Sequence, residues 1–478
     1  MAATAANIVE DPHAGATPAF SSADAAELVE RLRASFNAGK TRPLAWRREQ
    51  LKAVRRLLTK NARPLAAALA EDLGKPEFEA HTTDVAFPIS EASIALKNLQ
   101  RWTRPEKAAL PAVQRPAKAY TVFEPLGVVL VIAPWNYPVQ LVFNPLVAAI
   151  AAGNCAIVKP SELTPKTSAL IAKLIREYLD GDCIAVVEGA VDETTALLEQ
   201  RFDHIFYTGN GRVARVVMEA AAKHLTPTTL ELGGKSPCVV AADADLATAA
   251  RRIAWGKFTN AGQTCTAPDY VLVERAAAAE LTEKLAATIT EFYGADPKAS
   301  PDFARIVSRR HAERLAAMLD DGATKAAGGD VDLDERYVAP TLLTDVSTDS
   351  KVMDEEIFGP ILPILAVDDL DEAIDTINRG DKPLALYVFG ADKARCDRVL
   401  ASTSSGGACV NATLWHVANP NLPFGGVGES GMGAYHGRYG FERLSHRKAV
   451  TEKPTRMDPK VGYPPYSRIK LWLAKRFM

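Results

Sequence analysis

The sequence predicts an α/β protein built from two doubly wound, Rossmann-like domains, each organised around a parallel sheet. Three observations lead to this fold class. Short apolar runs alternate with helical segments from about residue 122, the alternation resumes after Gly234, and 478 residues suffice for two large domains. Because ligands in such folds lie at the carboxyl ends of strands, we expect the functional residues in the loops that follow strands.

The first layer of predicted elements follows a helical N-terminal region. Residues 23–73 are rich in Ala, Leu, Glu and Arg with helical spacing, interrupted near Pro43 and Pro64. Strands are predicted at 128–133, 155–159, 184–187 and 204–207, and helices at 141–152, 165–179 and 194–200. The alternation of strand and helix indicates βαβ units.

The second layer begins after residue 234, so the two layers are expected to meet near residues 231–235. Strands are predicted at 238–240, 270–273, 361–367, 386–389 and 409–411. Helices are predicted at 246–258, from 274 to Tyr293, and at 370–378.

Composition excludes several classes of protein. The chain has 56 Lys and Arg against 58 Asp and Glu and is 47% hydrophobic, which describes a globular protein without the basic stripe of a nucleic-acid partner. Six scattered cysteines without a CxxC motif predict reduced thiols, with no disulfide framework and no metal site. The start lacks the pattern of a secretory signal, and no apolar run is long enough to span a bilayer, so we expect a cytoplasmic protein.

Four loops carry residue types that suit catalysis or binding. GNGRVA at 209–214 matches the phosphate-binding pattern G-x-G-x-x-[GA], although a plain helix-start turn fits equally well. Cys265 lies in a loop where a thiol is accessible, and Asn136 follows an apolar strand, from which its amide can stabilise an oxyanion. Glu231 is either a general base or, by its spacing from GNGRVA, a ribose ligand. Glu356 is a second loop carboxylate that can hold a ribose, with Phe358 as a packing ring; solvated turns are the alternative for both carboxylates.

In this order the motifs resemble the aldehyde dehydrogenase superfamily over most of the chain, from about residue 31 to 466. The agreeing motifs are PWNYP (134–138), KPSE (159–162), YTGN (207–210), ELGGKSP (231–237), GQTC (262–265), EEIFGP (355–360) and LPFGGVGESGMG (422–433). Details such as TRPLAWR, RRIAWGKF, GMGAYHG and the closing YPP are similar to the class 3 branch, which acts on fatty and aromatic aldehydes.

The resemblance implies NAD(P)+-dependent oxidation of medium- or long-chain aliphatic or aromatic aldehydes to carboxylic acids. Cys265 is implied as the nucleophile that forms a thiohemiacetal and then a thioester. The Asn136 amide and the Cys265 backbone amide are implied as the oxyanion hole, and Glu231 as the base for hydrolysis, which takes it away from the ribose. Walls of the substrate site are expected from Tyr137, Trp255 and His416.

The implied cofactor is NAD or NADP. Its contacts are expected from Trp135, Lys159, Glu162, Thr208, Gly209, Arg212, Leu232, Gly233, Glu356 and Phe358. The phosphate turn departs from the family pattern, because Ala214 stands where a glycine is usual. Glu162 repels a 2′-phosphate whereas Arg212 can reach one, so the preference between the two cofactors stays open.

The resemblance also implies the aldehyde dehydrogenase fold, in which a small β-arm for oligomerisation joins the two domains. We expect an N-terminal flexible tail at 1–22, a cofactor-binding domain at 23–102 and 125–231, and a catalytic domain at 232–416. The arm and its returning segment are expected at 103–124 and 417–450, forming a homodimer, and a C-terminal tail at 451–478. The closing SRIKLWLAKRFM predicts a short basic helix that makes weak, peripheral contact with a membrane surface, or one that caps the substrate entrance or the partner subunit.

Two other functions are compatible with such a fold. A CoA-acylating semialdehyde dehydrogenase uses a thiol in place of water, but that branch typically lacks a glutamate at the position of Glu231. A catalytically silent binding relative would not need to keep Cys265, Glu231, Asn136 and Glu356 together.

Overall fold

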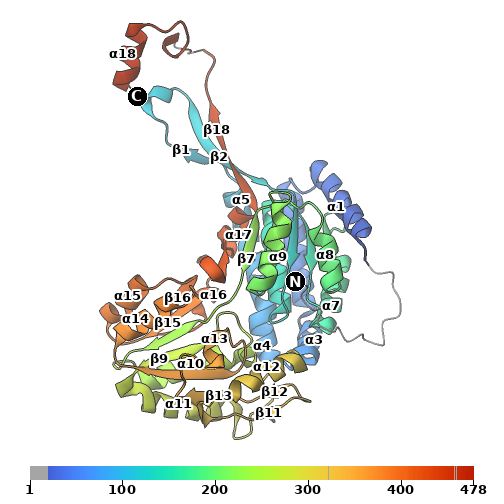
Figure 1. Cartoon of the computed structure of the whole chain (residues 1–478). Helices are drawn as coiled ribbons and strands as arrows, with labels where there is room; N and C mark the ends of the chain where they lie inside the picture. The colour runs from blue at the N-terminus through green and yellow to red at the C-terminus, as the bar shows by residue number, and fades with distance from the viewer. Residues whose placement is uncertain (1–19, 321, 457, 459, 478) are drawn as a thin grey trace, which may run out of the picture.

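The computed structural model describes residues 20–320, 322–456, 458 and 460–477. Two α/β layers form the body, and a narrow arm projects from it (Figure 1). Most of the predicted tail at 1–22 lies outside the described residues. Its last residue already belongs to helix α1 (Ser22–Asn37), which Ser21 caps by accepting a hydrogen bond from the Asp24 N–H.

The first layer is a six-stranded sheet in the order β17-β7-β6-β3-β4-β5. All its pairs are parallel except β17 with β7. The strands are β3 (Val128–Ile132), β4 (Cys155–Lys159), β5 (Ile184–Val186), β6 (His204–Thr208), β7 (Thr228–Glu231) and β17 (Gly431–Met432). Its helices are α2 (Leu44–Lys60), α3 (Ala62–Leu73), α5 (Ala86–Trp102), α6 (Pro138–Ala152), α7 (Pro165–Tyr178), α8 (Val191–Leu198), α9 (Gly211–Ala222) and α17 (Gly437–Arg443). The short α4 (Glu77–Glu79) and the π-helix η1 (Ala80–Val85) connect α3 to α5.

Helix α6 occupies the centre of this layer, and every one of its residues is buried. It begins at Pro138, three residues before the predicted start, because proline suits the first turn of a helix, where its missing N–H is not needed. It ends at Gly153, whose φ of 92° is a left-handed conformation that glycine adopts without steric cost. The start of α6 therefore comes directly after the PWNYP loop.

The second layer is a seven-stranded sheet in the order β10-β13-β14-β9-β8-β15-β16. Its strands are β8 (Pro237–Val240), β9 (Tyr270–Glu274), β10 (Thr324–Ala327), β13 (Thr341–Thr344), β14 (Ile361–Val367), β15 (Ala385–Phe389) and β16 (Gly407–Val410). Its helices are α10 (Leu246–Phe258), α11 (Arg275–Tyr293), α12 (Arg309–Leu319), α13 (Lys351–Asp354), α14 (Leu370–Arg379), α15 (Lys393–Ser402) and α16 (Trp415–Ala418). A two-stranded ribbon, β11 (Val331–Asp332) with β12 (Tyr337–Val338), lies beside it.

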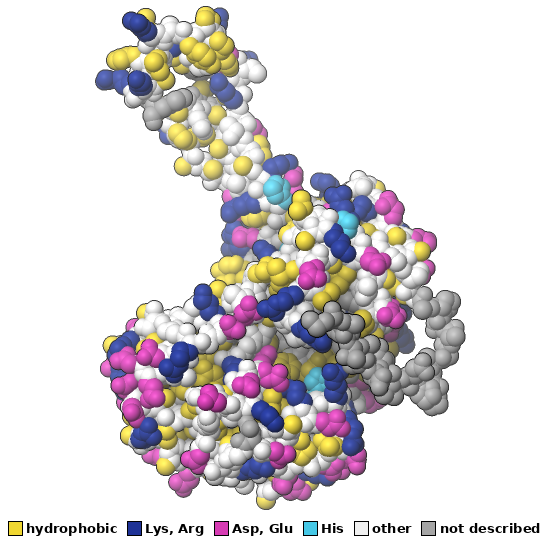
Figure 2. All heavy atoms as spheres, viewed as in Figure 1, with side chains coloured by type: hydrophobic (Ala, Val, Ile, Leu, Met, Phe, Trp, Pro, Cys, Tyr) yellow, Lys and Arg dark blue, Asp and Glu magenta, His cyan; other side chains and the backbone are white. Residues whose placement is uncertain are grey.

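The arm is an antiparallel sheet of β1 (Glu106–Ala108), β2 (Lys118–Pro125) and β18 (Ser445–Glu452). At its tip lies α18 (Arg468–Phe477), where basic and apolar side chains are mixed on the surface (Figure 2). The segment 417–450 was expected to contribute to the arm and its returning segment, and within it β18 lies in the arm. Strand β17 instead extends the six-stranded sheet, and α17 packs on α5 and α6. Within the described residues, no helix has both the length and the apolar character needed to cross a bilayer.

Candidate active site

The predicted site residues lie at one edge of the six-stranded sheet. Lys159 ends β4, Thr208 ends β6, Glu231 ends β7, and Trp135 and Asn136 follow β3. The register pairs Ile132 with both Lys159 and Tyr207, and Thr208 with Glu231, so these strands end at the same level. This is the edge at which doubly wound folds bind their ligands.

Cys265 follows an irregular turn, η3 (Thr259–Gly262), that connects α10 to the thiol. Asn260, Ala261 and Gly262 all have positive φ, at 55°, 51° and 75°. A Cβ on Gly262 would lie 2.2 Å from the carbonyl oxygen of Gly359, so only glycine fits at this position. Of the six cysteines, all within the described residues, Cys265 is the one that is not fully buried. Strained backbone thus carries the accessible thiol, a combination typical of functional sites.

Gln263 anchors this turn from inside the protein. Its side-chain amide donates to the carbonyl oxygens of Asn260 and Arg305, both at 3.0 Å, and its side-chain oxygen accepts the Val307 N–H at 2.9 Å. The Asn136 side-chain amide donates to the backbone carbonyl of Gln263 at 3.1 Å. The Asn136 amide is therefore held two residues before the thiol, where an oxyanion donor is needed.

A buried ion pair fixes the backbone around Asn136. The Lys75 ammonium donates to Asp84 at 2.6 Å and to the Asn136 carbonyl oxygen at 3.0 Å, and the side chains of Lys75 and Asp84 are fully buried. Asp84 also accepts the N–H groups of Val139 and Gln140, at 3.1 and 3.3 Å, in the first turn of α6. A carboxylate at a helix N-terminus is favourable because the free N–H groups point at it.

Tyr137 connects the PWNYP loop to the cysteine loop. Its hydroxyl shares a 2.6 Å hydrogen bond with the Thr264 hydroxyl, and the Lys75 nitrogen lies 4.2 Å from the centre of its ring. Burial raises the pKa of Tyr137 well above its ordinary value, so this hydroxyl stays protonated.

Glu231 is a buried carboxyl without a hydrogen-bond partner within the described part of the chain. It is 2% exposed, and neither carboxyl oxygen is paired. Burial raises its pKa well above the ordinary value, although the Arg443 guanidinium opposes this. Burial, then the carboxyls of Glu356 and Glu231, raise the pKa of the Cys265 thiol. The thiol therefore has to lose its proton before it can react, and both carboxyls lie close enough to influence it.

Glu356 approaches the backbone of the loop that follows Glu231. A Cβ on Gly233 would lie 2.1 Å from a Glu356 carboxyl oxygen, so glycine is required for this approach. The Lys235 ammonium holds the two loops together by donating to Asp269 at 2.7 Å and to the Glu355 carbonyl oxygen at 3.0 Å. Burial and the nearby Asp269 raise the pKa of Glu356 to about 8.

The nucleotide-binding residues show features that suit a dinucleotide. A Cβ on Gly209 would lie 2.2 Å from the Tyr207 hydroxyl oxygen, and the Thr208 hydroxyl is buried without a partner among the described residues. Helix α9 begins at Gly211, where the Asn210 side chain accepts the Val213 N–H at 3.0 Å, and the other N–H groups of its first turn favour a phosphate. The Lys159 ammonium, nearly buried, lies 3.2 Å from the exposed Glu162 carboxylate.

The remaining predicted cofactor residues differ in their surroundings. The Trp135 ring lies 5.3 Å from the ring of Phe358 at an angle of 80°, so the two aromatics pack edge to face, and Phe358 has a positive φ of 48°. Leu232 is buried and its N–H donates to the Ser430 carbonyl oxygen at 3.1 Å. Arg212 is exposed in the first turn of α9.

The expected substrate walls differ in their surroundings. Tyr137 is buried beside Thr264, as described above. His416 is also buried, and its Nδ1 lies 3.2 Å from the Cys409 sulfur. Trp255 on α10 is 43% exposed, so it is only partly enclosed.

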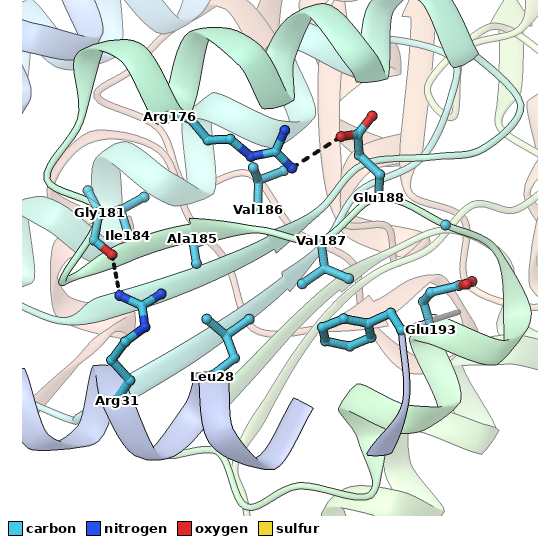
Figure 3. Close-up of a pocket in the computed structure, with 12 residues that line it drawn as sticks. Leu28, Arg31, Arg176, Gly181, Ile184, Ala185, Val186, Val187, Glu188 and Glu193 are labelled. Carbon is cyan, nitrogen blue, oxygen red and sulfur yellow. Dashed lines mark hydrogen bonds and ion pairs between the residues drawn. The ribbon is translucent and has the colours of Figure 1, made fainter. Parts of the chain in front are cut away.

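A hollow of about 670 Å³ lies away from these residues, at the edge strand β5 (Figure 3). It is bordered by Leu28 and Arg31 of α1 and by the chain from Ile184 to Gly189. Its arginines are already engaged, because Arg31 donates to the Gly181 carbonyl oxygen at 2.6 Å and Arg176 pairs with Glu188 at 3.2 Å. None of the predicted catalytic or cofactor residues lines it, so we place the site at the carboxyl edge of the sheet.

Comparison with known proteins assigns the chain to a family. A family model described as "Aldehyde dehydrogenase family" matches residues 5–450. The chain belongs to the aldehyde dehydrogenase family. It is 50% identical to aldehyde dehydrogenase family 3 member A2 of Mus musculus, over 94% of this chain and 93% of that protein. It is 48% identical to the "dimeric NADP-preferring" aldehyde dehydrogenase of Canis lupus familiaris, over 92% and 97%.

The solved structures agree with this assignment. The substrate-bound state of Staphylococcus aureus AldH superimposes with a TM-score of 0.92 at 45% identity, over 95% of this chain and 99% of that one. The predicted class 3 resemblance and the α/β aldehyde dehydrogenase fold are both confirmed. The chain is an enzyme of NAD(P)+-dependent aldehyde oxidation.

Several residues that organise this aldehyde dehydrogenase site were not found from the sequence. Lys75 and Asp84 form a buried ion pair from a helical region without a motif. Asp269 accepts hydrogen bonds from Lys235 and from the Ile357 N–H. Asn260 donates to the Asn136 carbonyl oxygen at 3.0 Å. The one available signal was the Gly- and polar-rich loop around Cys265, which marked Asn260 and Asp269 as neighbours of the thiol without giving them roles.

Proposed function

We propose that this chain oxidises medium- to long-chain aliphatic or aromatic aldehydes to carboxylic acids, by way of a thiohemiacetal and a thioester on Cys265. The observation that carries the proposal is the Asn136 side chain, which is fixed beside the turn that presents the accessible thiol. An amide aimed at this point stabilises the negative charge that develops when a thiolate attacks a carbonyl.

The first half of the reaction builds the thiohemiacetal. Cys265 passes its proton to a base, its sulfur bonds to the aldehyde carbon, and the carbonyl oxygen becomes an oxyanion. The Asn136 amide and the Cys265 backbone N–H donate to that oxyanion. When bound, NAD(P)+ supplies the hydride acceptor that turns this adduct into the thioester.

Lys159, Thr208, Gly209 and Glu356 would hold the dinucleotide, together with Trp135, Glu162, Arg212, Leu232, Gly233 and Phe358. Support comes from the glycine close approaches at 209 and 233 and from the unpaired Thr208 hydroxyl. Glu356 suits a ribose because its carboxyl oxygens can accept hydrogen bonds from the ribose hydroxyls. Glu162 lies where it would oppose a 2′-phosphate, whereas Arg212 would attract one.

The second half of the reaction releases the acid. Glu231 takes a proton from water, the water oxygen bonds to the thioester carbon, and the carbon–sulfur bond breaks to regenerate Cys265. Burial raises the pKa of Glu231, which makes its carboxylate a stronger proton acceptor than an exposed one. Tyr137, Trp255 and His416 form the walls around the aldehyde in this proposal.

We also propose a cytoplasmic homodimer formed through the arm, with weak contact between the C-terminal tail and a membrane surface. The name of the canine relative supports a dimer. Ile469, Leu471 and Trp472 of α18 are more than half exposed between basic residues, which suits either a membrane surface or a partner subunit. Light scattering tests the dimer. Co-sedimentation with anionic vesicles, with and without residues 468–478, separates the two roles of the tail.

The experiment that tests the activity follows absorbance at 340 nm after mixing the enzyme with decanal or benzaldehyde and NAD+ or NADP+, without CoA. Repeated turnovers support the proposal. A single burst that resumes only when CoA is added would indicate an acylating dehydrogenase, and the absence of any signal would indicate a silent binding relative.

A further inference from the structure

Unpaired polar groups gather on one face of the six-stranded sheet. In the β6–β7 pairing, Phe206 is opposite Thr229 and Thr208 is opposite Glu231. Because side chains alternate along a strand, these four share one face. The Thr208 hydroxyl and both Glu231 oxygens on this face are buried, and none has a hydrogen-bond partner within the described residues. Buried polar groups are rarely left unpaired, so this face has hydrogen bonds still to form during catalysis.

Tyr435 covers the same face. Its ring lies 4.9 Å from the ring of Phe206 at an angle of 73°. Its backbone is fixed by two hydrogen bonds with Phe424, of 2.8 and 3.0 Å. The side chain is 1% exposed, and its hydroxyl has no partner among the described residues. A buried phenol hydroxyl therefore lies over the strand end that carries Glu231.

The other strong donor on this face is already engaged. Arg443 of α17 donates through Nε to the Thr229 hydroxyl at 2.9 Å and through Nη2 to the Thr228 carbonyl oxygen at 2.5 Å. An ionised carboxylate can only accept hydrogen bonds, whereas a phenol can donate one. Thr208 is committed to the cofactor in the proposed function. The Tyr435 hydroxyl is then an unengaged donor over this face, like the His204 Nδ1, and it is the one whose ring packs on Phe206 near the strand end that carries Glu231.

Helix α6 brings a further unpaired polar side chain, an amide, towards this place. Asn144 is 2% exposed, and neither polar atom of its side chain is paired with a described residue. It precedes Ala148 by one helical turn, on the same side of α6. A Cβ on Gly440 would lie 2.9 Å from the Ala148 Cβ and 3.7 Å from the Tyr435 Cβ, so this side of α6 faces the Tyr435 segment.

We propose that Tyr435 is a positioning residue for Glu231, to which its hydroxyl donates a hydrogen bond, directly or across one bound water, while the thioester is hydrolysed. The inference rests on the proposed function, in which Glu231 is the base. The hydrogen bond stabilises the ionised carboxylate and holds it in the orientation needed to take a proton from water. Without it, the carboxylate would be ionised only at higher pH.

The groups that face Glu231 set the pH dependence of deacylation. They are the Arg443 guanidinium of α17, the Cys265 thiol and the Tyr435 hydroxyl. Two further carboxyls act on Glu231 only through these neighbours: Glu356 faces Cys265, and Glu91 of α5 faces Tyr435. His204 on β6 shares the face, but burial and Arg443 lower its pKa to about 3, so it stays neutral.

The test follows hydrolysis of the acetyl-enzyme formed from p-nitrophenyl acetate, without cofactor, in wild type, Tyr435→Phe and Glu231→Gln from pH 5.5 to 9. Phenylalanine keeps the ring on Phe206 and removes only the hydroxyl. The matched control is Tyr439→Phe, since that side chain is 40% exposed on α17 and lies outside the site. Stopped-flow absorbance gives the acylation burst, and intact-protein mass spectrometry gives the decay of the acetyl-enzyme.

We expect Tyr435→Phe to leave the burst unchanged and to slow deacylation about tenfold at pH 7. The apparent pKa in the pH profile of deacylation should rise by about one unit, because a tenfold change and a shift of one pKa unit correspond to the same free energy. In the Glu231→Gln background the same change should have no further effect. The proposed role of Tyr435 would be overturned if the apparent pKa and the rate of deacylation were both unchanged. It would also be overturned if the two substitutions had additive effects, or if Tyr435→Phe slowed the burst. If wild type formed neither acetyl-enzyme nor NADH from an aldehyde, the proposed function itself would fail.

Discussion

The side-chain amide of Asn136 donates to the backbone carbonyl of Gln263 at 3.1 Å, which joins the loop after β3 to the turn before Cys265. The bond fixes the distance between the two proposed halves of the oxyanion hole before any substrate arrives. An oxyanion donor that is already in place loses little free energy to reorganisation during the reaction.

Asn136→Ala should reduce kcat by about 100-fold or more, the usual effect of removing one oxyanion donor. Binding of the dinucleotide should be unaffected and is measured by quenching of Trp fluorescence. A rate equal to wild type would remove Asn136 from the site.

Cys265→Ala should abolish aldehyde oxidation, because no other thiol is available to form the covalent adduct. The matched control is Cys396→Ala, at a buried cysteine on α15. Turnover is followed at 340 nm, and substantial activity in the Cys265 variant would refute the nucleophile assignment.

Glu231→Gln should retain the first burst of NADH and slow the steady state, since the amide cannot accept a proton from water. The pKa of Glu231 is raised by burial, so the ionised base becomes more abundant as pH increases. Wild-type deacylation should therefore increase with pH through that pKa, and the glutamine variant should lack this rise. Loss of the burst together with weaker cofactor binding would instead favour a ribose contact.

Lys75→Met should lower the free energy of unfolding by about 3–5 kcal/mol, because it leaves Asp84 charged and unpaired in the interior. The matched control is Arg56→Met, whose partner Glu49 lies at 3.1 Å on the surface, where a pair contributes about 1 kcal/mol or less. Urea unfolding measures both. Equal losses of unfolding free energy in the two variants would show that the buried pair contributes no more to stability than the surface pair.

Glu162→Gln should improve the use of NADP+ relative to NAD+ by about 5- to 10-fold, since it removes a negative charge from the proposed ribose end of the site. The matched control is Glu188→Gln, which removes another exposed carboxylate, one that pairs with Arg176, and should leave the cofactor preference unchanged. The ratio of kcat/KM for the two cofactors decides. An unchanged ratio would place Glu162 away from the 2′ position.

Most of the parallel strands in both sheets could be predicted, because buried strands such as β3 and β4 are continuous apolar runs. Strand β7 was missed, since TTLE has only four residues and carries polar side chains. The pairing of β2 with β18 joins residues more than 300 apart, and half-exposed strands leave no apolar run to signal it.

The site was predictable where chemistry is concentrated in motifs around Cys265, Glu231 and Asn136. The supporting pair of Lys75 and Asp84 was not, because a lysine and an aspartate nine residues apart in a helical region usually face solvent. The packing of η1 against α6 brings them next to the loop that carries Asn136. No motif in the sequence signals that contact.

Cys265 is carried by the chain between α10 and β9, yet its side chain packs against the core of the six-stranded sheet, which carries Glu231. Thiol and carboxyl therefore meet across the seam between the two layers. Mild denaturants that separate the two sheets at this interface should abolish turnover while both sheets remain intact. Loss of activity should then report the separation of the two sheets. It should occur at a lower denaturant concentration than the loss of secondary structure measured by circular dichroism.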